Sequence, residues 1–189
     1  MVTGSVALLA HGGAKGVVKE RMEAMERHDE LTDRIFAMIH GELPYNADAV
    51  RKAAAEIKQT SGAHLVNLFP KGSGGKPSEA TDAIWQNMST FEHFAERLQT
   101  FASEVERTAE SKPDGNSSLP KKWEDVPAMG QMMGPSGGMM RGPGMMRGRG
   151  MMGGPGGGRG GAMANTVEGA VWRLAHMCNS CHEQFRKEK

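Results

Sequence analysis

The sequence lacks the features of several large functional classes. Its formal net charge is only +1 over 189 residues, and its few basic clusters have no aromatic residues interleaved for stacking on bases, which argues against nucleic acid as a partner. No apolar run approaches the roughly 18 to 20 residues needed to cross a bilayer, so we expect no membrane span. No Ser/His/Asp set or pair of carboxylates stands out as catalytic, and we expect a protein that is not an enzyme.

Strand signals are absent too, and the sequence predicts an all-α fold. Apolar residues recur three or four positions apart over residues 15–40, 46–68 and 78–110, and again from about residue 165 onward. Asn46 and Asn165 are placed to cap the second and the last of these helices. Four amphipathic helices with broad apolar faces predict an antiparallel up-down-up-down four-helix bundle.

Two further segments do not belong to the expected bundle. Residues 111–163 are dominated by Gly, Met, Pro, Ser and Arg without helical or strand periodicity, so we expect a long flexible loop between the third and fourth helices. Residues 1–10 hold a short apolar stretch that looks like the remnant of a signal peptide, with a frayed terminus as the alternative. Residues 14–110 then carry helices one to three, and residues 164–189 carry the fourth.

The chemistry is indicated by one motif in the last helix, Cys178-Asn179-Ser180-Cys181-His182. This C-x-x-C-H pattern attaches haem c, because two thiols add to the vinyl groups and the adjacent imidazole reaches the iron. On a helix, Cys178 and His182 are four residues apart and share a face, with Cys181 beside them. The chain has no other cysteine, which leaves these two without another structural use.

Two other uses of a C-x-x-C pair compete with haem attachment, namely a thioredoxin-like redox pair and a structural disulfide. A thioredoxin-like motif needs a preceding strand and a surrounding sheet, which the sequence does not predict. Haem attachment is favoured because His182 directly follows the second cysteine. We therefore expect a c-type cytochrome, in which the bundle encloses one haem c per chain and His182 ligates the iron.

Outside the long loop, the pattern resembles the cytochrome c prime family of four-helix bundles. The resemblance covers roughly residues 14–110 and 165–187. Several landmarks match in order: Lys19-Glu20-Arg21, Gly41-Glu42-Leu43-Pro44-Tyr45-Asn46, Phe69-Pro70, Ile84-Trp85, and C-x-x-C-H-x-x-F-R ending at Arg186. The resemblance implies a bacterial periplasmic location, redox partner proteins, and an expectation of homodimers that pair through the first two helices.

Members of this family divide by the residue opposite the proximal histidine, four positions after the arginine of the first helix. Here that residue is Met25, counted from Arg21. A methionine resembles the low-spin, cytochrome c-556-like branch that transfers electrons, whereas an apolar residue would leave five-coordinate iron that binds gases such as NO and CO. Plain core packing is the alternative for Met25, and His28 is its nearest rival as ligand.

The resemblance also places two arginines at the cofactor. Arg21 and Arg186 would lie near the haem propionates or the proximal face, where a fixed positive charge compensates carboxylates and tunes the potential. A solvated helix charge is the alternative for each of them.

Because a methionine at position 25 resembles the low-spin branch, electron transfer is the favoured function, and a five-coordinate gas-binding protein is the second.

A third hypothesis concerns copper, and it rests on the methionines of the long loop. Thioethers are soft ligands, and a flexible chain that presents many of them suits cuprous ion in an oxidising compartment. The alternative is a low-complexity insertion that only tolerates methionine. The candidate ligands are Met129, Met132, Met133, Met139, Met140, Met145, Met146, Met151, Met152 and Met163.

Overall fold

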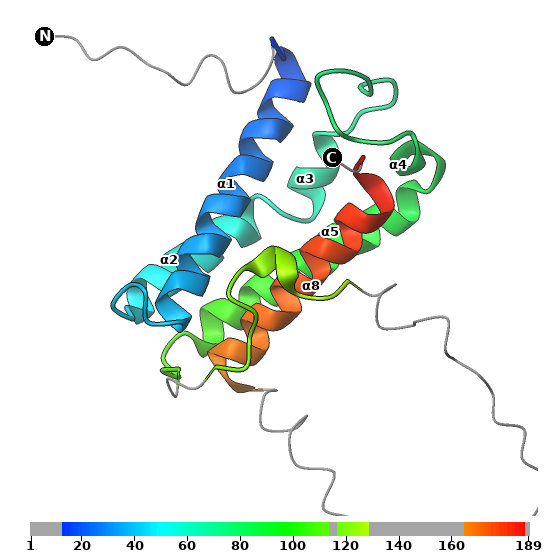
Figure 1. Ribbon diagram of the computed structural model, residues 1–189. Helices are drawn as coiled ribbons and strands as arrows, with labels where there is room; N and C mark the ends of the chain where they lie inside the picture. Colours follow the sequence, from blue (N-terminus) through cyan, green and yellow to red (C-terminus); the bar gives the residue numbers. More distant parts are fainter. Residues whose placement is uncertain (1–12, 114–116, 129–164, 188–189) are drawn as a thin grey trace, which may run out of the picture.

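The computed structural model describes residues 13–113, 117–128 and 165–187, and its architecture is a four-helix bundle (Figure 1). The long helices are α1 (Gly16–Ile39), α2 (Ala47–Gln59), α5 (Met88–Thr108) and α8 (Val167–Phe185). Each packs on the next along the chain, and α8 returns to α1, so that the four close a ring around one core. The predicted fold class is confirmed.

The first helix and the turn after it follow the sequence closely. Helix α1 ends at Ile39, and Gly41 has a φ of +73°, a left-handed conformation that favours glycine. The side chain of Asn46 then accepts a hydrogen bond from the Ala49 N–H at 2.9 Å and caps α2, as predicted. This connection sets α2 beside α1 and fixes which face of each helix is buried.

The second expected helix, 46–68, is wrong as a single element. It divides into α2 and a short α3 (Ala63–Asn67), because Gly62 lies between them with a φ of +60°. The Gly62 N–H donates to the carbonyl oxygen of Ala95 on α5 at 3.1 Å instead of continuing a helix. The break turns α3 against α5 (Figure 1).

The third expected helix, 78–110, also begins later than predicted. Residues 78–82 are not helical, and Ala80 instead forms an isolated antiparallel bridge with Arg186. A short α4 (Ala83–Gln86) follows, and α5 begins after the break at Asn87. The last helix begins close to the predicted position, but Thr166 rather than Asn165 is its cap, with Thr166 Oγ1 accepting from the Gly169 N–H at 3.2 Å.

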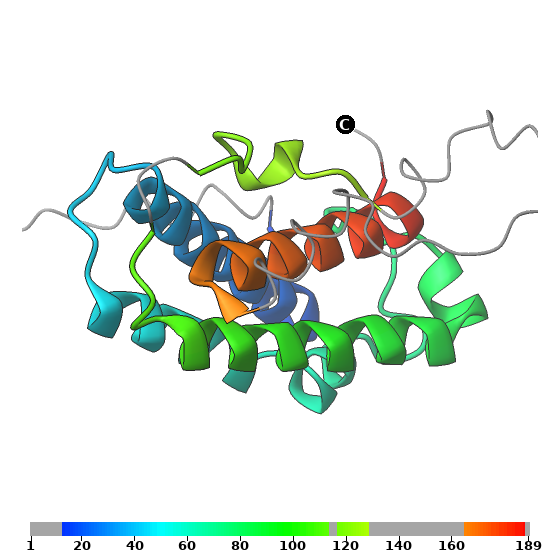
Figure 2. The same cartoon turned by 90° about the horizontal axis from the view of Figure 1, so that it is seen from below.

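The expectation of a flexible loop throughout 111–163 is wrong for residues 117–128, which we call the strap. The strap includes a turn of 3-10 helix, η1 (Trp123–Asp125), and it lies across α1 and α8 on one side of the bundle (Figure 2). Leu119, Trp123 and Val126 are buried there. Apolar side chains too sparse to show a period can still order a segment when neighbouring helices offer a surface to cover.

The core lies between the four long helices and is filled mainly by aliphatic side chains. Its fully buried members include Ile35, Val50, Ile57, Val105, Val171 and Leu174. At the end near α3 and α4, Phe69, Phe91 and Phe185 pack edge to face. No helix in the described part of the chain is long and apolar enough to cross a membrane.

Some predictions concern residues outside the described ranges. They are the signal-peptide remnant at residues 1–10 and the methionines from Met129 to Met163 that we considered as copper ligands.

Candidate haem site

The three residues of the attachment motif lie on α8, with side chains that are each partly buried. Both cysteines are free thiols. Desolvation raises the pKa of Cys178 to about 12 and is also the main reason that the pKa of Cys181 rises to about 12. A redox-active C-x-x-C pair needs the opposite, a thiolate with a lowered pKa. These neutral thiols therefore argue against thioredoxin-like chemistry and suit addition to a vinyl group.

His182 is poised to be a neutral ligand. Its pKa is lowered to about 4, mainly by burial and also by the positive charge of Arg186, while the carboxylates of Asp29 and Glu79 oppose the shift. The imidazole is therefore uncharged at neutral pH, and a neutral ring nitrogen is the form that binds iron.

Helix α8, which carries the motif, packs on α1, the helix that carries Met25. The carboxylate of Asp29, one turn after Met25, raises the pKa of Cys178 and acts on His182, so α1 and the motif lie within electrostatic reach of each other. Met25 is on the buried stripe of α1 between Arg21 and His28, and it packs against the core while staying partly exposed. Met25 therefore lies on the side of α1 that packs into the bundle.

His28, the rival of Met25, is directed to a different partner. His28 Nε2 and Thr60 Oγ1 share a hydrogen bond at 2.6 Å, and Thr60 Oγ1 also lies 2.8 Å from the Glu56 carbonyl oxygen. This bond ties His28 to the end of α2. Its Nε2 is therefore engaged with Thr60 in this structure.

Arg21 is the largest fully buried side chain that carries a charge, with only 2 % of its surface exposed. Its Nη1 and Nη2 donate to Oγ and the carbonyl oxygen of Ser73, at 3.0 and 2.6 Å, and its guanidinium lies 5.0 Å from the ring centre of Phe69. Its Nε has no hydrogen-bond partner among the described residues, and desolvation lowers its pKa. A buried guanidinium held by neutral acceptors is suited to an anion.

Arg186 has a partner on the protein. It is the residue just after α8, and its Nε donates to Glu79 Oε2 at 2.6 Å. Its side chain is 37 % exposed. Its charge contributes to lowering the pKa of His182, and the carboxylate that compensates the charge of Arg186 belongs to Glu79.

Sequence reasoning missed three residues next to the motif, namely Asp29, Trp123 and Asn179. Trp123 packs on the ring of His182 and donates to Asp29, while Asn179, inside the motif, holds the strap. The one signal for Trp123 was a tryptophan followed by Val126 in a segment otherwise poor in large apolar residues. Nothing in the sequence paired Asp29 or Trp123 with α8.

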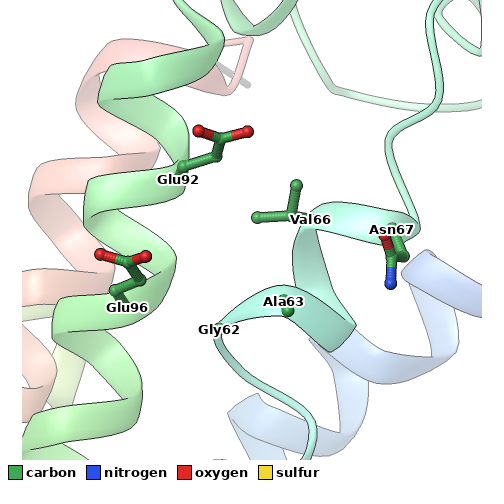
Figure 3. A pocket seen from close by; sticks show the side chains of 6 residues that line it. All are labelled: Gly62, Ala63, Val66, Asn67, Glu92 and Glu96. Atoms are coloured by element: carbon green, nitrogen blue, oxygen red, sulfur yellow. The ribbon is translucent and has the colours of Figure 1, made fainter.

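A shallow pocket of about 160 Å³ lies elsewhere, between α3 and α5 (Figure 3). Val66 and Asn67 of α3 line one side, and the exposed Glu92 and Glu96 of α5 line the other. It includes neither a cysteine nor a histidine of the motif. We therefore assign no part of the haem site to it.

Comparison with known proteins identifies the family of the chain. The cytochrome C' family model matches residues 16–129, more than half of the chain, and the C-x-x-C-H motif lies beyond the matched range. Cytochrome c-556 of Agrobacterium tumefaciens (strain II Chrys) is 32% identical over 90 residues, which are 48% of this chain and 72% of that protein. Cytochrome c-556 of Agrobacterium fabrum (strain C58 / ATCC 33970) is 34% identical over 92 residues, 49% of this chain and 62% of that protein.

Solved structures show the same fold at low identity. Cytochrome c prime from Shewanella frigidimarina superposes with a TM-score of 0.58 at 16% identity, covering 93% of this chain and 99% of that one. Cytochrome c' from Thermochromatium tepidum gives 0.57 at 17% identity, covering 91% and 95%. Taken with the matched residues and the relatives in Agrobacterium, the bundle and its C-x-x-C-H helix mean that this chain belongs to the cytochrome c' family and is a haem c protein.

Proposed function

We propose that the chain is a periplasmic c-type cytochrome that transfers single electrons to and from redox partner proteins and catalyses no reaction of its own. In this proposal Cys178 and Cys181 hold one haem, and His182 and Met25 are the axial ligands. The observation that supports it is that α8, which carries the neutral, partly buried His182, packs on α1, whose core-facing side includes Met25.

The residues present fit a covalent haem. Each neutral thiol S–H would add across a vinyl group, with sulfur forming the new C–S bond and the proton going to the other vinyl carbon. Arg21, buried and hydrogen-bonded among the described residues to Ser73 alone, would meet the propionate carboxylates. When bound, the haem supplies the one-electron chemistry between ferrous and ferric iron.

The bundle itself favours electron transfer. Met25 and His182 come from two long helices that pack directly on each other, and the core behind them is close-packed. Ligands held on rigid elements move little when the iron changes its charge, which keeps the reorganisation energy small. A thioether and an imidazole together also favour low-spin iron with both axial positions filled.

A five-coordinate, gas-binding protein is the second candidate, and one comparison favours it. A solved neighbour at 16% identity is a nitric oxide complex of a cytochrome c prime variant from Alcaligenes xylosoxidans. Such a function needs a sixth position that is open or easily vacated. In this chain Met25 stands at the position that would have to be open.

The absorption spectrum of the oxidised holoprotein separates the two functions. We expect a low-spin spectrum with the weak long-wavelength band of methionine bound to ferric iron. Met25→Ala should convert it to a high-spin spectrum without that band. Met22→Ala is the matched control, because Met22 is also a partly buried methionine on α1, and it should leave the spectrum unchanged. A Met25→Ala protein with the wild-type spectrum would move the ligand elsewhere and restore the gas-binding function.

Covalent attachment is tested separately by extraction into acidified organic solvent. Thioether bonds should keep the haem with the protein through this extraction. Release of the haem from the wild-type chain would overturn the attachment at Cys178 and Cys181.

A further inference from the structure

The strap is fastened to the attachment motif itself. Asn179, the first residue between the two cysteines, directs its Nδ2 at the carbonyl oxygens of Trp123, Glu124 and Val126, at 2.9, 3.3 and 2.7 Å. One amide nitrogen therefore lies within hydrogen-bond distance of three carbonyl oxygens in and just after the single turn of η1. These bonds place η1 directly against the part of α8 that carries the motif.

Both flanks of the strap are tied down as well. Toward its end, His176 Nδ1–H donates to the carbonyl oxygen of Pro127 at 2.6 Å. Nearer its start, His40 Nε2–H donates to that of Pro120 at 2.8 Å. The strap is thus held to α8 at one end and to the end of α1 at the other, and it crosses between those helices (Figure 2).

At the centre of the strap, the indole of Trp123 points from the strap backbone toward His182. Only 6 % of its surface is exposed, and its ring centre is 6.0 Å from that of His182, with the planes at 63°. Its Nε1–H donates to Asp29 Oδ1 on α1 at 2.9 Å. The indole therefore joins α1 to the strap and covers the side of the imidazole that faces the strap.

We propose that the strap is a solvent shield for the proximal ligand, with Trp123 as a residue that positions His182 and keeps water from it. This inference rests on the proposed function, in which His182 binds the iron. The iron-bound imidazole keeps one ring N–H, and an apolar cover slows its contact with water. Excluding water also disfavours the ferric state, which carries one more positive charge than the ferrous state, and so raises the reduction potential.

The test compares two properties of the holoprotein, the exchange of the His182 ring N–H with D2O, followed by NMR with labelled histidine, and the midpoint potential. Trp123→Ala and Asn179→Ala should each accelerate the exchange by about tenfold or more, because opening the strap then costs less free energy. Both should lower the potential. Trp123→Phe, which keeps a ring but loses the bond to Asp29, should give a smaller change of the same sign.

Lys122→Ala is the control within the strap, because Lys122 is exposed and adjacent to Trp123. It should leave both properties at the wild-type values. If Trp123→Ala does not fold, Trp123→Phe and Asn179→Ala decide the question.

The outcomes separate the shield from the haem site. Unchanged exchange and potential in Trp123→Phe and Asn179→Ala, with covalent haem and a low-spin spectrum retained, would overturn the shield and leave the proposed function intact. Loss of the haem from the wild-type chain on acidified extraction would overturn the proposed function, and the shield with it. Faster exchange together with a lower potential in both variants supports the shield.

Discussion

The burial of His28 predicts a specific loss of stability in acid. Desolvation is the main cause that lowers its pKa from 6.5 to about 4, with the charge of Glu56 opposing the shift. Between these two pH values the unfolded chain binds a proton at His28 that the folded chain does not. The free energy of unfolding therefore falls as the pH falls from about 6.5 to about 4, and this contribution is fully present above pH 6.5.

The size of the effect follows from the two pKa values. Protonation of the unfolded chain at this one site costs the folded state about 2 kcal/mol at pH 5 and about 3 kcal/mol at pH 4. His28→Gln removes the titrating ring while keeping an N–H donor for Thr60. On acidification from pH 7, the free energy of unfolding of the variant should therefore fall less than that of the wild type, by about 2 kcal/mol at pH 5 and about 3 kcal/mol at pH 4. This expectation does not depend on the stability of the variant at pH 7.

Urea unfolding followed by circular dichroism at pH 7, 5 and 4 measures the difference. His93→Gln, the same substitution at an exposed position on α5, is the matched control and should lose as much stability in acid as the wild type. All three proteins have the same carboxylates, so the contribution of these groups to the pH dependence of the unfolding free energy cancels when the proteins are compared. Parallel curves for wild type and His28→Gln would refute the burial of a neutral His28.

Three further results are expected. Arg21→Gln should lower the midpoint potential in a potentiometric titration, because a buried positive charge disfavours ferric iron; an unchanged potential would separate Arg21 from the haem. Asn46→Ala should cost about 1 kcal/mol of unfolding free energy in urea, since α2 loses its cap, and no loss would contradict the capping bond. Anaerobic titration with cuprous ion against a chelator should show saturable binding that is absent after excision of residues 129–163, and equal competition by both proteins would exclude copper there.

The parts of the fold that were predicted correctly depend on local sequence. The apolar spacing of α1 and the Asn46 cap are properties of neighbouring residues, and both are found in the structure. The break at Gly62 is different, because apolar residues continue at helical spacing on both sides of it. What ends α2 there includes a hydrogen bond to Ala95, which is close to Gly62 only after α5 has packed.

The residues of the site likewise fall into those that local sequence identified and those whose placement depends on distant contacts. The spacing of C-x-x-C-H and the resemblance around Arg21 identified the candidate ligands without a structure. The burial of Arg21 depends on Ser73, 52 residues further along, and that of Trp123 on partners 94 and 56 residues away. Contacts at such separations leave no period in the sequence, and the glycine-rich composition after the strap concealed the ordered segment before it.

The helical geometry of α8 explains why a residue inside the motif binds the strap. At about 100° per residue, Cys178, Cys181 and His182 share one face of α8, and Asn179 stands on the flank next to His182. Ser180 points to the other side, where it is buried and donates to the carbonyl oxygen of His176. Position 179 is thus the one motif residue that can hold a cover over His182 without entering the face used for attachment. An amide there, with two N–H donors and no charge, can bind the carbonyl oxygens of the strap without adding a charge beside the iron ligand.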